Sequence, residues 1–128
     1  MASVHLENAS GFSQHIRART HTLTADEPAS NGGTDTGPDP YELLLSGLAA
    51  CTALTLRLYV ARKEWTLGRI GIHARFVREA DGTERIERDV TLESELDAQQ
   101  IGRLADICEK TPVTKTLKRS MTITTRFV

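Results

Sequence analysis

Apolar residues alternate with polar residues at the start of the chain, which is the pattern of β-strands. The apolar positions of this segment are Val4, Leu6, Phe12, Ile16 and Ala18. They are interrupted by the turn-forming segment Asn8-Ala-Ser-Gly11. We therefore predict an N-terminal β-hairpin.

The same alternation recurs twice further along the chain. One predicted strand contains Ile70, Ile72, Ala74 and Phe76, and a less regular return strand contains Ile86, Val90 and Leu92. Asp81-Gly82 lies between these strands and favours a tight turn, so they form a second predicted hairpin. Near the C-terminus, the alternating residues of a predicted closing strand are Met121, Ile123, Thr125 and Phe127.

A long helix is predicted to begin at Pro40. Asp39 is a typical N-cap, Pro40 suits the first helical position and Glu42 the third. Arg62 and Lys63 suit the C-terminal end. Residues 26–40 hold three of the four prolines and three of the nine glycines. We interpret that segment as a loop within one domain, because what precedes it is too short to fold alone.

Apolar side chains cover nearly the whole circumference of this helix. They are Leu43, Leu44, Leu45, Leu48, Ala49, Ala50, Ala53, Leu54, Leu56 and Leu58. A helix that is apolar all round must be buried on several sides. Either it passes through the middle of a sheet-wrapped core, or a second subunit covers it.

A second helix is predicted after Asp97, which forms a capping box with Gln100. Its apolar stripe consists of Ile101, Leu104, Ala105 and Cys108. Pro112 is expected to end or kink this helix near Lys110. The predicted fold class is α+β, with antiparallel strands around one very buried helix. A length of 128 residues favours a single domain spanning residues 1–128.

Composition and charge exclude several classes of function. Sixteen basic and 17 acidic residues give a net charge of −1, and 5% of residues are aromatic, so nucleic acid is not expected as the main partner. The longest uncharged stretch, residues 43–56, is shorter than the roughly 20 residues needed to span a bilayer. The N-terminus lacks both the basic start and the apolar segment of a secretory signal. We therefore expect a cytoplasmic protein.

Two cysteines are the candidate chemical groups. Cys51 lies in the long helix among small residues, which leaves room for a reactant, and a thiol becomes a nucleophile as its thiolate. No cation lies within one helical turn, so an activating charge must come from elsewhere in the fold. Cys108 lies on the apolar stripe of the second helix. Core packing is the alternative interpretation for both thiols, and a disulfide between them is geometrically possible if the helices pack.

The first hairpin offers two candidates for the activating cation, although simple exposure to solvent is the more common role of such arginines. Arg17 and Arg19 share one strand face, and either could reach Cys51. Glu42 could orient such an arginine, although helix capping is its simpler role and it lies ~13 Å from Cys51 along a straight helix. The four histidines show no metal-ligand spacing, so no metal site is expected.

The chain resembles the OsmC/Ohr family of small peroxide-handling proteins. Four segments carry the resemblance, in family order: Gly32-Gly-Thr-Asp-Thr-Gly-Pro-Asp-Pro-Tyr-Glu-Leu-Leu-Leu45, Leu48-Ala-Ala-Cys-Thr52, Arg57-Leu-Tyr-Val-Ala-Arg-Lys63 and Thr111-Pro-Val-Thr-Lys-Thr-Leu117. The resemblance implies an intertwined homodimer with buried central helices. It also implies thiol-dependent reduction of organic hydroperoxides in oxidative-stress defence, without a metal or organic cofactor. Cys51 matches the peroxidatic cysteine, and a dithiol reductant would reopen the resulting disulfide.

The chain departs from the family pattern at three places. Thr111 stands where the family's second cysteine usually lies, so Cys108, three residues earlier, is the predicted resolving thiol. The turn of the first hairpin lacks the family's arginine, and Arg19 or Arg17 is predicted to replace it. The family's active-site glutamate falls at Tyr41, one residue before Glu42.

The leading functional hypothesis is a cytoplasmic, dimeric thiol peroxidase acting on organic hydroperoxides. Its catalytic residues would be Cys51, Cys108, Arg19 and Glu42, beside an apolar pocket lined from Leu44, Leu48 and the partner subunit. The alternative is a non-catalytic dimeric module that binds a small apolar ligand and has structural cysteines. A thiol hydrolase is weaker still, because it needs a histidine near Cys51.

Overall fold

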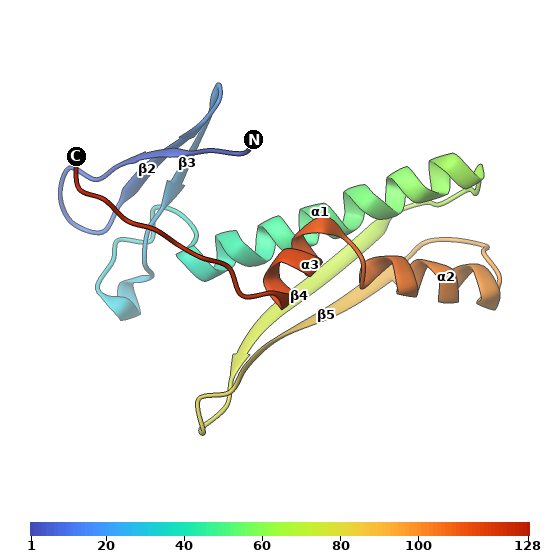
Figure 1. Cartoon of the computed structure of the whole chain (residues 1–128). Coiled ribbons are helices and arrows are strands. Elements are labelled where there is room, and N and C mark those ends of the chain that lie inside the picture. The colour runs from blue at the N-terminus through green and yellow to red at the C-terminus, as the bar shows by residue number, and fades with distance from the viewer. The chain divides into compact units, whose positions relative to one another are not determined.

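The computed structural model describes residues 1–128, with five strands and three α-helices (Figure 1). The chain divides into two compact units, residues 1–46 (unit 1) and residues 47–128 (unit 2), and each is described by itself. Both sheets are antiparallel, so the predicted α+β class with antiparallel strands is confirmed.

Unit 1 contains a three-stranded sheet in the order β1-β2-β3. These strands are β1 (His5–Glu7), β2 (Gln14–Ala18) and β3 (His21–Ala25). Leu6 is the register partner of Ile16, which confirms the predicted N-terminal hairpin. Strand β3 was not predicted; it pairs with β2 along all five of its residues.

The loop that follows β3 is organised around the buried side chain of Asp26. Its carboxylate accepts hydrogen bonds from the backbone N–H groups of Glu27 (2.7 Å) and Thr36 (3.1 Å). It also accepts from the hydroxyls of Thr34 (2.8 Å) and Thr36 (2.6 Å). The Thr36 hydroxyl is the largest of the influences that hold the Asp26 pKa well below its usual range. A single carboxylate therefore closes the loop that leads into the first helix.

Two glycines of this loop allow close backbone contacts. A Cβ atom at Gly33 would lie 2.0 Å from the carbonyl oxygen of Glu27, and one at Gly37 would lie 2.2 Å from that of Thr24. A side chain at Gly33 would clash with the backbone of the same loop, and one at Gly37 would push the loop away from β3. The glycine-rich composition of residues 26–40 thus has a steric reason.

Helix α1 (Pro40–Lys63) has the predicted bounds and the predicted start. Asp39 accepts a hydrogen bond from the backbone N–H of Glu42 (2.8 Å), and the Glu42 carboxylate accepts one from the backbone N–H of Asp39 (2.9 Å). This reciprocal capping box satisfies two backbone donors that the first helical turn would otherwise leave unpaired.

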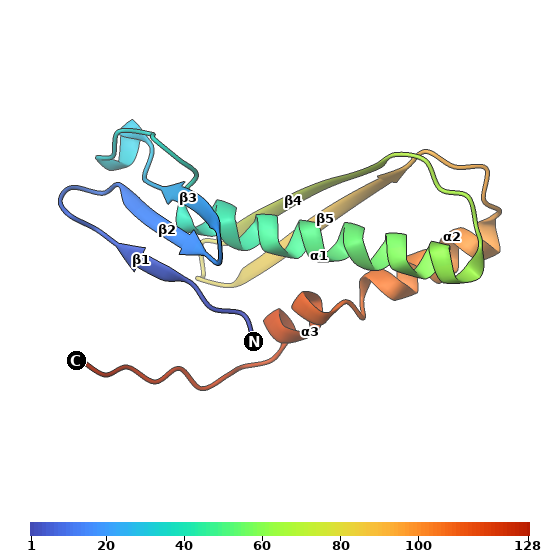
Figure 2. The ribbon, with the colours of Figure 1, turned by 90° about the horizontal axis from the view of Figure 1, so that it is seen from above.

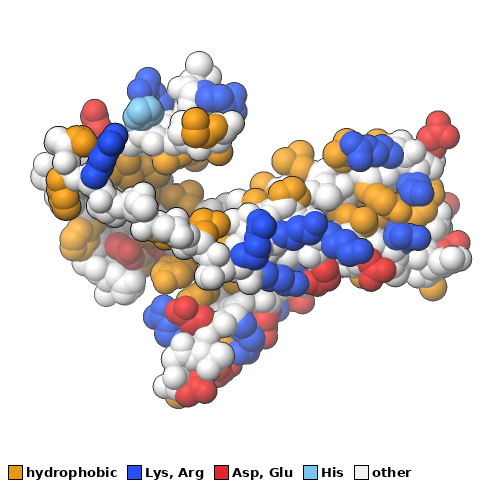
Figure 3. All heavy atoms as spheres, in the orientation of Figure 1, with side chains coloured by type: hydrophobic (Ala, Val, Ile, Leu, Met, Phe, Trp, Pro, Cys, Tyr) orange, Lys and Arg blue, Asp and Glu red, His pale blue; other side chains and the backbone are white.

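The chain buries one row of α1 rather than the several sides that we predicted. The buried row is Leu48, Thr52, Leu56 and Val60. Leu44, Leu54 and Leu58 are exposed, and Figure 3 shows apolar side chains at the surface along this helix. By length and composition alone α1 could also cross a membrane; two residues of its buried row, Leu56 and Val60, pack in the core of unit 2. A single chain therefore does not wrap α1 in a sheet-covered core. A second subunit, the other expected cover, stays a prediction.

Unit 2 contains the second predicted hairpin, formed by β4 (Ile70–Arg78) and β5 (Glu84–Leu92). Ile72 pairs with Val90 and Phe76 with Ile86, so these apolar side chains share one face. The opposite face carries ion pairs, among them Arg75 with Asp89 and Arg75 with Glu87. Alternation therefore separates a packed face from a charged face, as the two-residue period requires.

Two further helices complete unit 2, and Figure 2 shows them beside α1. Helix α2 (Ala98–Cys108) begins with the predicted capping box of Asp97 and Gln100. Helix α3 (Pro112–Lys118) was not predicted; Pro112 opens a new helix after α2 has ended at Cys108. The core of unit 2 consists of Leu56, Val60, Leu104 and Cys108.

The predicted closing strand near the C-terminus is wrong. Residues 119–128 form neither helix nor strand, and Met121, Ile123 and Phe127 are exposed. Alternation alone does not create a strand, because a strand also needs the backbone hydrogen bonds of a neighbour. The chain by itself supplies no such neighbour here.

We predict that Asp26→Asn lowers the thermal stability of the protein at pH 7 by several degrees, because a neutral amide cannot accept all four hydrogen bonds. A carboxylate with a lowered folded-state pKa stabilises the fold fully above its unfolded-state pKa of about 3.9, and this contribution is lost as the pH falls below that value. The difference in melting temperature between wild type and variant should therefore shrink between pH 5 and pH 2. A difference that is independent of pH would contradict the role of the ionised carboxylate.

Candidate thiol site

Cys51 lies near the middle of α1 and is half-buried with a free thiol. The Thr55 hydroxyl donates a hydrogen bond to the backbone carbonyl of Cys51 (2.7 Å), so this bond does not involve the sulfur. The next residue, Thr52, is fully buried, whereas the preceding Ala50 is exposed. Cys51 therefore lies at the boundary between the packed and the open side of α1.

Cys108 is the last residue of α2, and its thiol is also free. It is 9% exposed and belongs to the core of unit 2, as its place on the apolar stripe predicts. Burial raises the pKa of this thiol, while the nearby guanidinium of Arg88 lowers it and the carboxylate of Glu109 raises it. Burial prevails, so Cys108 is held as a neutral thiol at pH 7.

Arg88 connects the elements around the two cysteines. Its side chain is 12% exposed. Nη1 donates hydrogen bonds to Oγ1 of Thr52 on α1 (2.9 Å) and to Oγ1 of Thr114 on α3 (2.9 Å). Nη2 donates to the backbone carbonyl of Cys108 at the end of α2 (3.0 Å). One guanidinium from β5 thus reaches all three helices.

The position of Arg88 follows from the alternation of β5. Arg88 has the same parity as Ile86 and Val90, so it faces the helices rather than the charged side of the hairpin. Its register partner on β4 is Ala74, whose small side chain leaves room for a guanidinium. We did not predict this residue as a site residue. The signal in the sequence is a basic residue at an inward position of an otherwise apolar strand face.

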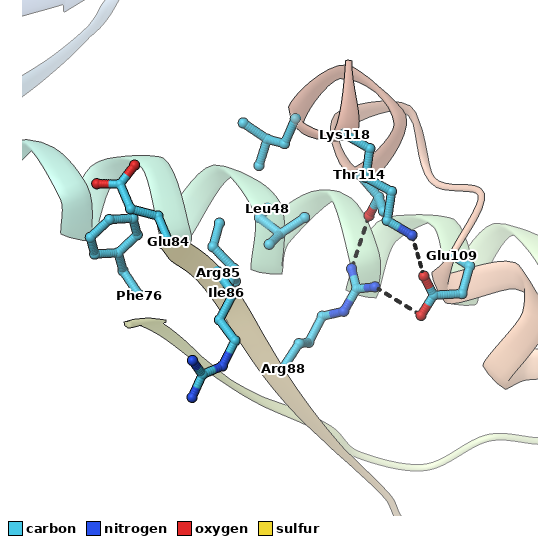
Figure 4. Close-up of a pocket in the computed structure, with 10 residues that line it drawn as sticks. Leu48, Phe76, Glu84, Arg85, Ile86, Arg88, Glu109, Thr114 and Lys118 are labelled. Atoms are coloured by element: carbon cyan, nitrogen blue, oxygen red, sulfur yellow. Dashed lines mark hydrogen bonds and ion pairs between the residues drawn. The ribbon is translucent and has the colours of Figure 1, made fainter. Parts of the chain in front are cut away.

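Glu109 and Lys118 form the outer part of this cluster, as Figure 4 shows. Glu109 Oε1 lies 3.9 Å from Nη2 of Arg88, and its Oε2 accepts a hydrogen bond from Nζ of Lys118 (2.6 Å). The bond from Lys118 is the main cause that lowers the pKa of Glu109. Because Glu109 is exposed, it compensates the buried charge of Arg88 across a partly solvated gap.

Two cavities of unit 2 meet at Arg88. The larger has a volume of about 490 Å³, within the usual size of small-molecule pockets. Its apolar lining residues are Leu48, Phe76, Ile86 and Leu117. The smaller, of about 260 Å³, lies between β5 and α2 and is lined by Arg88, Val90, Leu104 and Cys108, among others. Cys108 is therefore buried yet borders a small open volume.

The predicted site residues fall in both units. Cys51 and Cys108 belong to unit 2, whereas Arg17, Arg19 and Glu42 belong to unit 1. Arg19 is exposed and has a left-handed backbone conformation (φ 57°) in the turn between β2 and β3. Glu42 takes part in the capping box of α1, which confirms its simpler role. The roles of Arg19 and Glu42 toward Cys51 stay predictions, as does the lining of a pocket by Leu44.

The family assignment rests on most of the chain. A model of the OsmC-like protein family matches residues 33–126, which include α1, the β4–β5 hairpin and both later helices. The chain belongs to the OsmC-like family. This confirms the resemblance inferred from the sequence, and the second half of the glycine-rich loop before α1, from residue 33, is part of the matched region.

Solved structures share the fold of this OsmC-like chain. An OsmC-like protein from Mycoplasma pneumoniae is 25% identical with a TM-score of 0.76, over 92% of this chain and 86% of that one. The organic hydroperoxide resistance protein OhrB of Bacillus subtilis is 21% identical (TM-score 0.64; 92% and 90% coverage). An organic hydroperoxide resistance protein from Elizabethkingia anophelis is 14% identical (TM-score 0.70; 92% and 88% coverage). No curated protein matches the chain.

We predict that the two thiols differ in their pH dependence of alkylation. With Cys51→Ser, the remaining Cys108 should react with iodoacetamide along a profile whose midpoint lies above the ordinary cysteine value of about 8.5, because burial disfavours its thiolate. The alkylation rate should be followed by intact mass between pH 6 and pH 11. Guanidinium-unfolded protein is the control and should return the midpoint to the ordinary value. A folded-state midpoint below pH 8 would contradict this assignment.

Proposed function

We propose that this protein reduces organic hydroperoxides with its cysteine thiols and so contributes to defence against oxidative stress. The observation that carries the proposal is a free, half-buried cysteine on α1, Cys51, in a chain that belongs to the OsmC-like family and has a second free cysteine on α2. The names of two proteins with the same fold, both organic hydroperoxide resistance proteins, support this substrate class.

The chemistry proceeds in two thiol steps. The Cys51 thiolate attacks the distal oxygen of R–O–OH, the O–O bond breaks, and the alcohol leaves after taking up a proton. Cys51 then carries a sulfenic acid. The Cys108 sulfur attacks that sulfur, a disulfide forms and water leaves, and an external dithiol reductant restores both thiols. No metal or organic cofactor enters this scheme.

The activation of Cys51 requires a positive group near its sulfur. We assign this role to Arg19, with Arg17 as the alternative, and we assign Glu42 the role of holding that arginine. The capping box occupies one oxygen of Glu42 and leaves the other for such an interaction. An assembled dimer is the state in which we expect this arrangement.

We propose that the active form is a cytoplasmic homodimer. Leu54 and Leu58 expose 69% and 53% of their surface on the same side of α1, and water contact of this kind is costly. Residues 121–127 alternate in polarity without a strand partner. A second copy that covers α1 and pairs with this segment would remove both features.

A second candidate function is supported by the larger cavity of unit 2. Its volume of about 490 Å³ suits a small ligand, and its four apolar lining residues would contact the apolar part of that ligand. In that case the protein would be a non-catalytic dimeric binding module, and the raised pKa of Cys108 would reflect a structural thiol. The presence or absence of peroxide turnover separates the two functions.

We predict that the wild-type protein consumes cumene hydroperoxide in the presence of a dithiol, and that Cys51→Ser lowers this rate at least about 100-fold, because the substitution removes the nucleophile. Peroxide loss should be measured directly. Cys108→Ser should still react once per chain and stop at a sulfenic acid that dimedone can trap. Equal inactivity of the wild type and Cys51→Ser would reject the peroxidase and favour the binding module.

We also predict that Leu54→Glu shifts the protein from dimer to monomer in sedimentation equilibrium at micromolar concentration, because a buried unpaired carboxylate opposes association. Thr66→Glu, an exposed substitution outside the helix, is the matched control and should remain dimeric. A monomeric wild type, or a Leu54→Glu variant with unchanged mass, would contradict the proposed interface.

A further inference from the structure

We propose that Arg88 is a positioning residue for the second thiol step, which holds Cys108 beside the segment of α1 that carries Cys51 and stabilises the Cys108 thiolate as it attacks the sulfenic sulfur. This inference rests on the proposed function. It concerns a residue of unit 2 and is independent of how Arg19 or Glu42 activates Cys51.

Arg88 joins the two segments of the chain that carry the thiols. Its guanidinium bonds at once to the hydroxyl of Thr52, the residue next to Cys51, and to the carbonyl of Cys108 itself. The two bonds are 2.9 Å and 3.0 Å long and use different nitrogens of one rigid, planar group. The segments that carry the two thiols are therefore fixed through a single side chain.

A second connection keeps the end of α2 in place. The Thr114 hydroxyl accepts from Arg88 (2.9 Å) and also lies within hydrogen-bond distance of the Cys108 carbonyl (3.3 Å) and the Thr111 hydroxyl (2.7 Å). Thr111 is fully buried, and by the resemblance inferred from the sequence it stands where the family's second cysteine usually lies. In this chain the position holds a hydroxyl that supports the network around Cys108 instead of a thiol.

Arg88 also acts on the Cys108 thiol through its charge. The charged groups around Cys108 are Arg88 from β5, Glu109 directly after α2, and Lys118 from α3, which is paired with Glu109. Helix α1 contributes the apolar Leu56 and Val60 to the same core. Arg88 and Cys108 also line the same small cavity. The buried cation beside Cys108 is therefore Arg88, and it opposes the effect of burial on the thiol.

Filling the inward face of β5 does not by itself require a charge at this position. The neighbouring inward residues Ile86, Val90 and Leu92 fill the same face with apolar side chains. A permanent charge beside a thiol is useful when that thiol must ionise. In the resolving step, Cys108–S⁻ attacks the sulfur of Cys51–S–OH, the S–O bond breaks, and the hydroxide leaves as water after taking up a proton.

Two substitutions separate the charge of Arg88 from its geometry. Arg88→Gln keeps hydrogen-bond donors and removes the charge, whereas Arg88→Lys keeps the charge and removes the planar fork. Arg75→Gln is the matched control, because Arg75 is an ion-paired arginine on the opposite face of the hairpin. The full chain is treated with one equivalent of cumene hydroperoxide between pH 5.5 and pH 10. Dimedone trapping follows the sulfenic acid, and intact mass follows its conversion to the disulfide.

We expect Arg88→Gln to raise the pH midpoint of disulfide formation by about one unit and to slow this step about threefold at pH 7. A rise of one unit in the pKa of Cys108 lowers its thiolate fraction at pH 7 tenfold. The more basic thiolate is about threefold more nucleophilic, so the net slowing is about threefold. Arg88→Lys should keep the wild-type midpoint but slow the step at every pH. Sulfenic acid formation at Cys51 should stay within about twofold of wild type in all variants, because its activation is assigned elsewhere.

Unchanged rates and midpoint in Arg88→Gln would overturn the inference, as would an equal slowing by Arg75→Gln. Loss of sulfenic acid formation in the Arg88 variants alone would also overturn it, because Arg88 would then serve Cys51. Cooperative unfolding shows whether each Arg88 variant is folded. If one variant is not folded, the other still shows whether Arg88 affects disulfide formation. Failure of the proposed function looks different: the wild type itself would then form no sulfenic acid with the peroxide.

Discussion

The buried guanidinium of Arg88 is the interaction on which the arrangement of unit 2 depends. It reaches α1 through Thr52, α3 through Thr114 and the end of α2 through the carbonyl of Cys108. Each of these partners is a neutral oxygen, and the nearest carboxylate, that of Glu109, lies at 3.9 Å. Burying a cation is costly unless its donors are satisfied, so the helices must stay where these acceptors meet. One side chain thus fixes the packing of the three helices and the position of Cys108.

The same link shapes the surroundings of Cys108 in this OsmC-like chain. Thr111 and Thr114 form a buried pair of hydroxyls at the start of α3, and the thiol lies one helical turn earlier, at Cys108. Burial makes Cys108 a weak acid, and the neighbouring cation partly offsets this effect. Cys51, by contrast, lies half-buried on α1 at the edge of the packed face. The two thiols therefore occupy different environments, one in the core of unit 2 and one at the edge of the packed face of α1.

Local signals made the helices and hairpins predictable. Asp39 with Glu42, and Asp97 with Gln100, are short-range capping boxes that the sequence shows directly. Features that depend on distant partners were harder to predict. Residues 121–127 have the period of a strand but no neighbouring strand in the chain, and Pro112 starts a helix as readily as it stops one. The roles of both cysteines stay predictions, whereas the contacts of Arg88 were missed because its partners are 20 or more residues away.

The most direct test of this account is a double-mutant cycle on stability, with Arg88→Met, Thr114→Val and the two together, measured by urea unfolding at pH 7. The account predicts a coupling free energy above about 1 kcal/mol, since each single substitution breaks the same charged hydrogen bond within one network. Additive effects of the two substitutions would contradict the account, because Arg88 would then not be holding α3 to the rest of the thiol site.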